Sequence, residues 1–121
     1  MNAYLQVALG GAIGSVARFG LVRAMPGPGF PAGTVLVNVA GSLAMGLLAA
    51  LVASRGGLAW APFLMTGILG GFTTFSAFSL DALALWDRGP GALAVAYVAG
   101  SVILSLAAAA LGLAIGRGAF A

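Results

Sequence analysis

Cysteine, histidine and glutamate are absent from this chain of 121 residues. Their absence excludes disulfide bonds, thiol chemistry, the usual zinc sites and the commonest general base. Enzymatic activity is therefore the least expected class of function.

Charge is also scarce, because only 6% of the residues are charged whereas 62% are hydrophobic. A soluble domain carries about 25% charged residues, so a water-soluble fold is excluded. The net charge of +3 comes from scattered arginines and not from a basic cluster. The high pI therefore indicates no nucleic-acid-binding patch.

Four apolar segments alternate with breaks rich in glycine and proline, such as PGPGFP at 26–31. A membrane-spanning helix needs about 20 mainly apolar residues. We expect spanning helices over about 3–25, 32–54, 61–86 and 91–116, in a single all-α membrane domain covering residues 1–121. A secretory signal begins with positive charge. The first charged residue here is Arg18, after the apolar run, so we interpret the first segment as a retained helix.

Small residues recur four positions apart within these segments. The pairs are Gly10/Gly14, Ser42/Gly46 and Gly112/Gly116. Membrane helices pack closely at such residues, because the hydrophobic effect does not drive helix association in lipid. We interpret the pairs as packing faces.

The arginines near the membrane ends are evenly divided. Arg55 and Arg117 are expected on the side of the N-terminus, and Arg23 and Arg88 on the other side. The positive-inside rule then favours neither orientation. We therefore expect both orientations, combined in an antiparallel homodimer.

The third segment contains the run TGILGGFTTFSAFS at 66–79, whose glycines, threonines and serines weaken a helix at mid-membrane. Non-helical backbone at that depth persists only where it is buried in protein or lines a cavity. Two interpretations remain open. The carbonyls from Gly70 to Thr74 could be free to bind Na⁺, or the segment could be a flexible packing helix whose hydroxyls bond the i−4 carbonyl.

Polar side chains form a stripe on the second segment and another on the fourth. They are Thr34, Asn38 and Ser42, followed by Tyr97, Ser101 and Ser105. Residues four apart share a helix face, so each stripe must face protein or water. Such donors without fixed charge suit an anion that is held and then released. Contacts between helices are the alternative, which explains Asn38 least well.

Phe75 and Phe78 are three residues apart and share a face beside the polar stretch. The edge of a phenyl ring is positive and could support a small anion. Ordinary packing is the alternative for these two rings.

Three strings resemble the signature segments of the Fluc/CrcB fluoride channels: GGAIGSVAR at 10–18, GTVLVNVAGS at 33–42 and the run at 66–79. The resemblance covers essentially the whole chain, and the ordered set is highly specific. One departure is Ala77, where many members carry threonine.

The resemblance implies a passive fluoride channel in a prokaryotic cytoplasmic membrane. It further implies an antiparallel, dual-topology homodimer with two pores and a structural Na⁺ at its centre. By resemblance, fluoride would be bound along Asn38, Phe75, Phe78, Thr34, Tyr97, Ser101 and Ser105; Arg18 would lie near the vestibule; and the Gly70 and Thr73 carbonyls would bind Na⁺.

Two other membrane functions compete with this expectation. A proton-coupled exporter of similar size needs a carboxylate within the membrane, and the first three helices contain none as far as Phe78. A purely structural membrane subunit would leave Asn38 and Phe75 unexplained.

Overall fold

The computed structural model describes residues 1–27 and 29–121, and four of its helical segments are long and apolar enough to cross a membrane. No strand occurs in these described ranges, so the all-helical class and the four spans are confirmed. The elements are α1 (Ala3–Ala24), α2 (Ala32–Ser54), η1 (Pro62–Leu69), α3 (Gly70–Phe72), α4 (Ser76–Arg88) and α5 (Gly91–Ala119). Helices α4 and α5 extend past the ends expected at 86 and 116. The turn expected at 26–31 includes Pro28, which is outside the described residues.

The helix ends follow from local chemistry. Asn2 caps α1, because its side-chain oxygen accepts a hydrogen bond of 2.8 Å from the Leu5 amide. After α2, Gly56 and Gly57 have φ values of 67° and 122°, which a side chain would disfavour. Pro62 is the first residue of η1. A backbone N–H at that position has no partner within the helix, so the lack of an N–H in proline costs no hydrogen bond.

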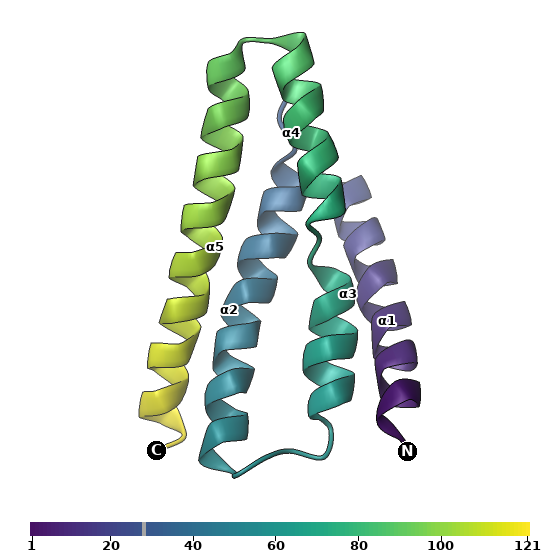
Figure 1. Ribbon diagram of the computed structural model, residues 1–121, viewed down its shortest axis with the longest axis vertical. Helices are drawn as coiled ribbons and strands as arrows, with labels where there is room; N and C mark the ends of the chain where they lie inside the picture. Colours follow the sequence, from purple (N-terminus) through teal and green to yellow (C-terminus); the bar gives the residue numbers. More distant parts are fainter. Residues whose placement is uncertain (28) are drawn as a thin grey trace.

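The helices lie side by side with both termini at the same end of the bundle (Figure 1). Most packing within the chain joins α1 to η1 and α3, or α2 to α5. The partners in each case are far apart in the sequence. The bundle therefore consists of two closely packed groups, with looser contact between them.

Glycine permits the close approach within each group. A methyl group on Gly14 of α1 would overlap the Ile68 carbonyl of η1, and one on Gly46 of α2 would overlap the Ala109 carbonyl of α5. Gly10, Gly112 and Gly116 are equally confined by neighbouring backbone or side-chain atoms. The interpretation of these glycines as packing faces is confirmed, and backbone contact supplies the packing energy.

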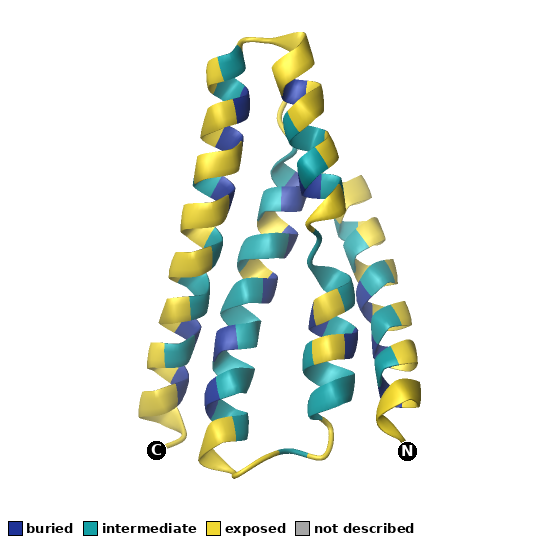
Figure 2. Ribbon diagram, in the orientation of Figure 1, coloured by how far each residue is buried: buried dark blue, intermediate teal, exposed yellow. Residues whose placement is uncertain are grey.

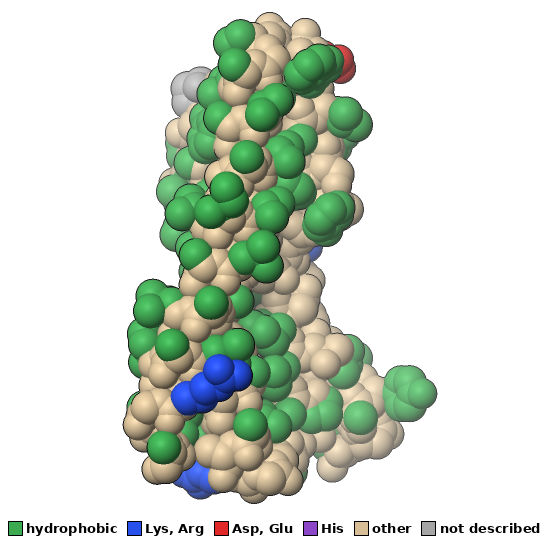
Figure 3. Space-filling view, turned by 60° about the vertical axis from the view of Figure 1, so that its left-hand side comes forward, with side chains coloured by type: hydrophobic (Ala, Val, Ile, Leu, Met, Phe, Trp, Pro, Cys, Tyr) green, Lys and Arg blue, Asp and Glu red, His purple; other side chains and the backbone are tan. Residues whose placement is uncertain are grey.

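The core of the single chain is small, and large apolar side chains cover its outside. The buried cluster consists of Phe78, Leu85, Ala94 and Tyr97. Figure 2 shows the exposed residues along the outer sides of the helices. Figure 3 shows hydrophobic side chains along the full height of one face, with few charged groups. This distribution suits a bilayer, where apolar side chains are stable against lipid.

Candidate functional site

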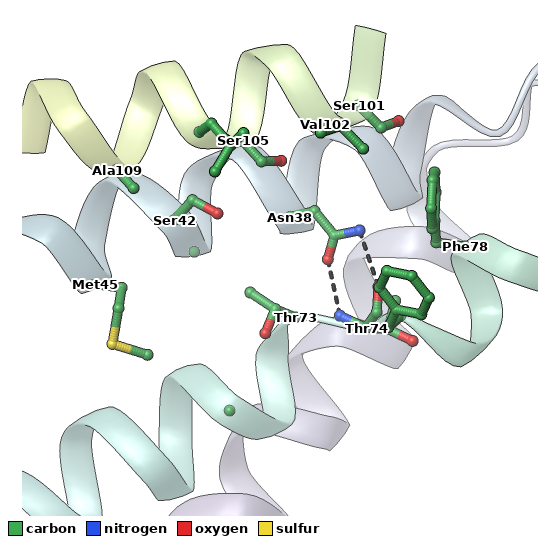
Figure 4. Close-up of a pocket in the computed structure, with 14 residues that line it drawn as sticks. Asn38, Ser42, Met45, Thr73, Thr74, Phe78, Ser101, Val102, Ser105 and Ala109 are labelled. Carbon is green, nitrogen blue, oxygen red and sulfur yellow. Dashed lines mark hydrogen bonds between the residues drawn. The ribbon is translucent and has the colours of Figure 1, made fainter. Parts of the chain in front are cut away.

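A groove of about 480 Å³ opens between α2, α5 and the segment that connects α3 to α4. Figure 4 shows polar side chains from α2 and α5 facing the segment that carries Thr73 and Thr74. The groove is lined by Asn38, Gly41, Ser42, Met45, Gly70, Thr73, Thr74, Phe75, Phe78, Ser101, Val102, Ser105, Leu106 and Ala109.

The backbone leaves the helical conformation beside this groove. Helix α3 ends at Phe72, Thr73 is extended with φ −87° and ψ 160°, and α4 begins at Ser76. We call residues 73–75 the junction. Local causes are the adjacent Gly70 and Gly71, which are conformationally permissive.

Asn38 replaces hydrogen bonds that the junction lacks. Its Nδ2 donates to the Thr74 carbonyl at 3.0 Å, and its Oδ1 accepts from the Thr74 amide at 2.8 Å (Figure 4). A carboxamide is the side chain that can donate and accept at once. Both bonds use atoms that face the groove, and one N–H of Nδ2 remains for another acceptor.

Two carbonyls at the junction lose their usual helical donors. In a continuous helix the Thr74 amide would bond the Gly70 carbonyl, and the Ala77 amide would bond the Thr73 carbonyl. Here the Thr74 amide bonds Asn38, and the Ala77 amide bonds the Thr74 hydroxyl at 3.1 Å. Gly70 and Thr73 both line the groove. Their carbonyl oxygens are the hard ligands that a cation such as Na⁺ prefers.

Arg18 lies on α1, on the other side of the junction. Its Nε donates to the Gly71 carbonyl at 3.0 Å, and its side chain is half-buried. Arg18 does not line the groove.

Thr34 and Tyr97 lie together at one carboxylate. The Thr34 hydroxyl donates to Oδ2 of Asp81 at 2.9 Å, and the Tyr97 hydroxyl donates to the same oxygen at 3.2 Å. Both hydroxyl residues are buried. The sequence placed Thr34 and Tyr97 on two separate polar stripes and indicated no partner for Asp81. The signal available was that Asp81 is the sole carboxylate well inside a spanning segment.

The two phenylalanines differ in their surroundings. Their rings lie 5.5 Å apart at 65°, an edge-on arrangement. Phe78 is buried and packs on Tyr97 at 5.3 Å, whereas Phe75 exposes 77% of its surface. Phe75 therefore lies outside the core of this chain, at the edge of the groove.

Ser101 and Ser105 bring hydroxyl groups into the groove from α5 (Figure 4). Ser101 is buried, and its Oγ has no hydrogen-bond partner among the described residues. A buried hydroxyl without a partner is uncommon, so Ser101 is available for a further hydrogen bond.

The groove thus contains most of the predicted site residues, namely Asn38, Gly70, Thr73, Phe75, Phe78, Ser101 and Ser105. Thr34 and Tyr97 belong to the Asp81 cluster, and Arg18 lies behind the junction. The sequence did not point to Thr74 as the partner of Asn38. A backbone partner 36 residues away leaves no local pattern.

Comparison with known proteins gives matches over almost the full length. A family model described as "CrcB-like protein, Camphor Resistance (CrcB)" matches residues 5–113. A Paracoccus denitrificans protein named "Fluoride-specific ion channel FluC" is 64% identical over 123 residues, covering 99% of this chain and 98% of the relative. Proteins of the same name are 56% identical in Cereibacter sphaeroides, covering 98% and 97%, and 51% identical in Agrobacterium fabrum, covering 94% and 95%.

Proposed function

This chain belongs to the CrcB family, and we propose from that premise that it is a fluoride-selective channel through which fluoride leaves the cell passively. The chain is a multi-pass integral membrane protein of a bacterial cytoplasmic membrane, and not an enzyme. The observation that carries the proposal is the 64% identity over nearly the whole length to a relative named as a fluoride-specific channel.

The groove supports this proposal because it offers donors without fixed positive charge. Its donors are the remaining N–H of Asn38 and the hydroxyls of Ser101 and Ser105. A neutral donor can replace part of the hydration shell of fluoride without trapping the ion. The positive edges of Phe75 and Phe78 would support the same ion.

Thr34 and Tyr97 would form the end of the path beside Asp81. Their hydroxyls bond this carboxylate, so fluoride would have to draw them away from it. Flow is outward without coupling, because the membrane potential favours anion exit by about 2.3 kcal/mol per 100 mV.

The proposed assembly is an antiparallel homodimer with two pores, each lined by both chains, and with the junction at the middle of the bilayer. Three observations support it: the even division of the end arginines, the termini at one end of the bundle, and the exposed Phe75 ring. An exposed ring beside a polar groove suits a pore completed by a second chain.

A structural Na⁺ fits the same assembly. The carbonyls of Gly70 and Thr73 would hold it, with two oxygens from each chain. Both carbonyls have lost their usual helical donors, as described above. The ion would satisfy oxygens that are costly to leave unpaired within a membrane.

Fluoride efflux from liposomes tests the proposed function. Purified protein should release fluoride from potassium fluoride vesicles when valinomycin allows K⁺ to leave and Na⁺ is present on both sides, and should release no chloride under the same conditions. Vesicles without protein and vesicles with the Asn38→Asp variant are the controls. Equal release of chloride would remove the proposed selectivity, and no release of fluoride would remove the function.

A further inference from the structure

Side chains of two different helices hold the backbone in the junction and just before it. Asn38 of α2 bonds both backbone groups of Thr74, and Arg18 of α1 bonds the carbonyl of Gly71. In a continuous helix the Gly71 carbonyl would accept from the Phe75 amide, so Arg18 takes the place of a helical bond.

An arginine within a membrane helix is costly unless it is paired. The Gly71 carbonyl would also be costly to leave without a donor inside the membrane. The hydrogen bond between Arg18 and Gly71 offsets both costs. The carbonyl lies at the C-terminal end of the helical run formed by η1 and α3. A positive charge is favoured there by the aligned peptide dipoles.

Bonding at Gly71 also restricts its neighbours. Gly70 and Gly71 are adjacent, and glycine restricts the backbone less than any other residue. Anchoring the Gly71 carbonyl toward α1 fixes the peptide plane between Gly71 and Phe72. The neighbouring carbonyls of Gly70 and Thr73 are then limited in the directions that they can take.

We infer that Arg18 is a positioning residue, which anchors the Gly71 carbonyl and thereby directs the free carbonyls of Gly70 and Thr73 toward a monovalent cation. The inference rests on the proposed channel and its Na⁺. It gives Arg18 a role at the backbone, in addition to the place near the vestibule that the family resemblance implies.

The first test measures fluoride flux at increasing Na⁺, with N-methylglucamine as the replacement cation. Losing a charge-assisted hydrogen bond should raise the Na⁺ concentration for half-maximal flux about tenfold or more in Arg18→Gln. Arg18→Lys keeps the charge but not the planar geometry, so it should raise this concentration about two- to fivefold. Arg23→Lys is the control, because Arg23 is on the same helix, lies over the Phe19 ring and keeps its charge at the end of the membrane in this variant, so the Na⁺ response should be unchanged.

The second test needs no fluoride flux. Backbone hydrogen exchange at 70–76 should be faster in Arg18→Gln than in the unaltered protein, and unchanged in Arg23→Lys. If Arg18→Gln does not fold, Arg18→Lys decides: a raised Na⁺ requirement and faster exchange support the inference, and unaltered values for both overturn it.

Other outcomes separate the inference from the proposed function. If Arg18→Gln slows flux while its Na⁺ response and exchange stay unaltered, Arg18 acts on the anion and the inference is wrong. Fluoride flux that does not respond to Na⁺ in the unaltered protein also overturns it, but leaves the channel standing. An unaltered protein that carries no fluoride overturns the proposed function, and the exchange measurement still shows whether Arg18 holds the junction.

Discussion

Asn38 has two roles, and a single substitution at this position tests both. Its carboxamide holds Thr74 through both its oxygen and its nitrogen, and its second N–H is available to an anion. The residue expected to bind fluoride is therefore also a support for the backbone that surrounds the ion.

Asn38→Asp should slow fluoride flux about ten- to a hundredfold, because the variant loses the donor to Thr74 and places a negative charge in an anion path. Flux in liposomes is the measurement. Asn2→Asp is the control, since Asn2 is exposed and its side chain only accepts a hydrogen bond, which aspartate can also do. Unaltered flux in Asn38→Asp would show that the groove is not the path.

Phe75→Ile and Phe78→Ile should both slow flux, but only the second should also lower stability. Phe78 is buried against Tyr97, so its loss leaves a cavity costing about 1–3 kcal/mol. Phe75 is exposed, and its replacement should leave the free energy of unfolding of a single chain nearly unchanged. Flux and thermal unfolding in detergent separate the effects, with the exposed Phe19→Ile as control. Two variants with unaltered flux would exclude the rings from the pore.

At the scale of elements, the sequence predicted the spans better than the contacts. Apolar runs bounded by glycine and proline determine where spanning helices can form, which is why four were found. The π-helix at Pro62–Leu69 was not predicted, because hydrophobicity does not report the hydrogen-bond register of the backbone. The Asp81 cluster was also missed, since it joins α2, α4 and α5 through residues far apart in sequence.

Close packing of α1 on η1 predicts contrasting effects for two glycines of the same helix. In Gly14→Ala the added methyl group would overlap the Ile68 carbonyl, so the protein should lose about 1–3 kcal/mol of stability. In Gly20→Ala the methyl group meets no atom of the chain within 4 Å. The higher helix propensity of alanine should therefore stabilise the protein by up to about 1 kcal/mol. Denaturant unfolding in one detergent measures both. Equal losses of stability in the two variants would show that contact with η1 does not cause the loss in Gly14→Ala.

At the scale of the whole molecule, the charges at the two ends govern orientation. Arg55 and Arg117 belong to the end with both termini, and Arg23 and Arg88 to the other. Reporter fusions at the C-terminus should therefore signal from both sides of the membrane. Lysines added after Ala121 should shift the population toward a cytoplasmic C-terminus. A single orientation in the unaltered protein would exclude the antiparallel dimer.

Asp81 decides between a channel and a proton-coupled exporter. A coupled exporter requires a group that takes up and releases a proton in each cycle, whereas the role proposed for Asp81 is to accept the hydroxyl bonds of Thr34 and Tyr97. The reversal potential should therefore follow the fluoride gradient at any imposed pH gradient, and Asp81→Asn should still conduct. Asp87→Asn, at the end of the same helix, is the control. A reversal potential that moves with the proton gradient would identify a coupled exporter.

Pairing of helices that are distant in sequence has a consequence for biosynthesis. Helix α2 packs mainly on α5, and Asn38 bonds Thr74, so neither partner exists when α2 leaves the ribosome. Translation proceeds at about 5–20 residues per second, so the roughly fifty residues between the end of α2 and the middle of α5 take about 3–10 s. Thr74 is synthesised about twenty residues after the end of α2, so the Asn38 carboxamide is without its backbone partner for about 1–4 s. A fragment that ends before Thr74 leaves the Asn38 carboxamide without its backbone partner, which is costly within a membrane, and it should therefore be less stable than the full chain.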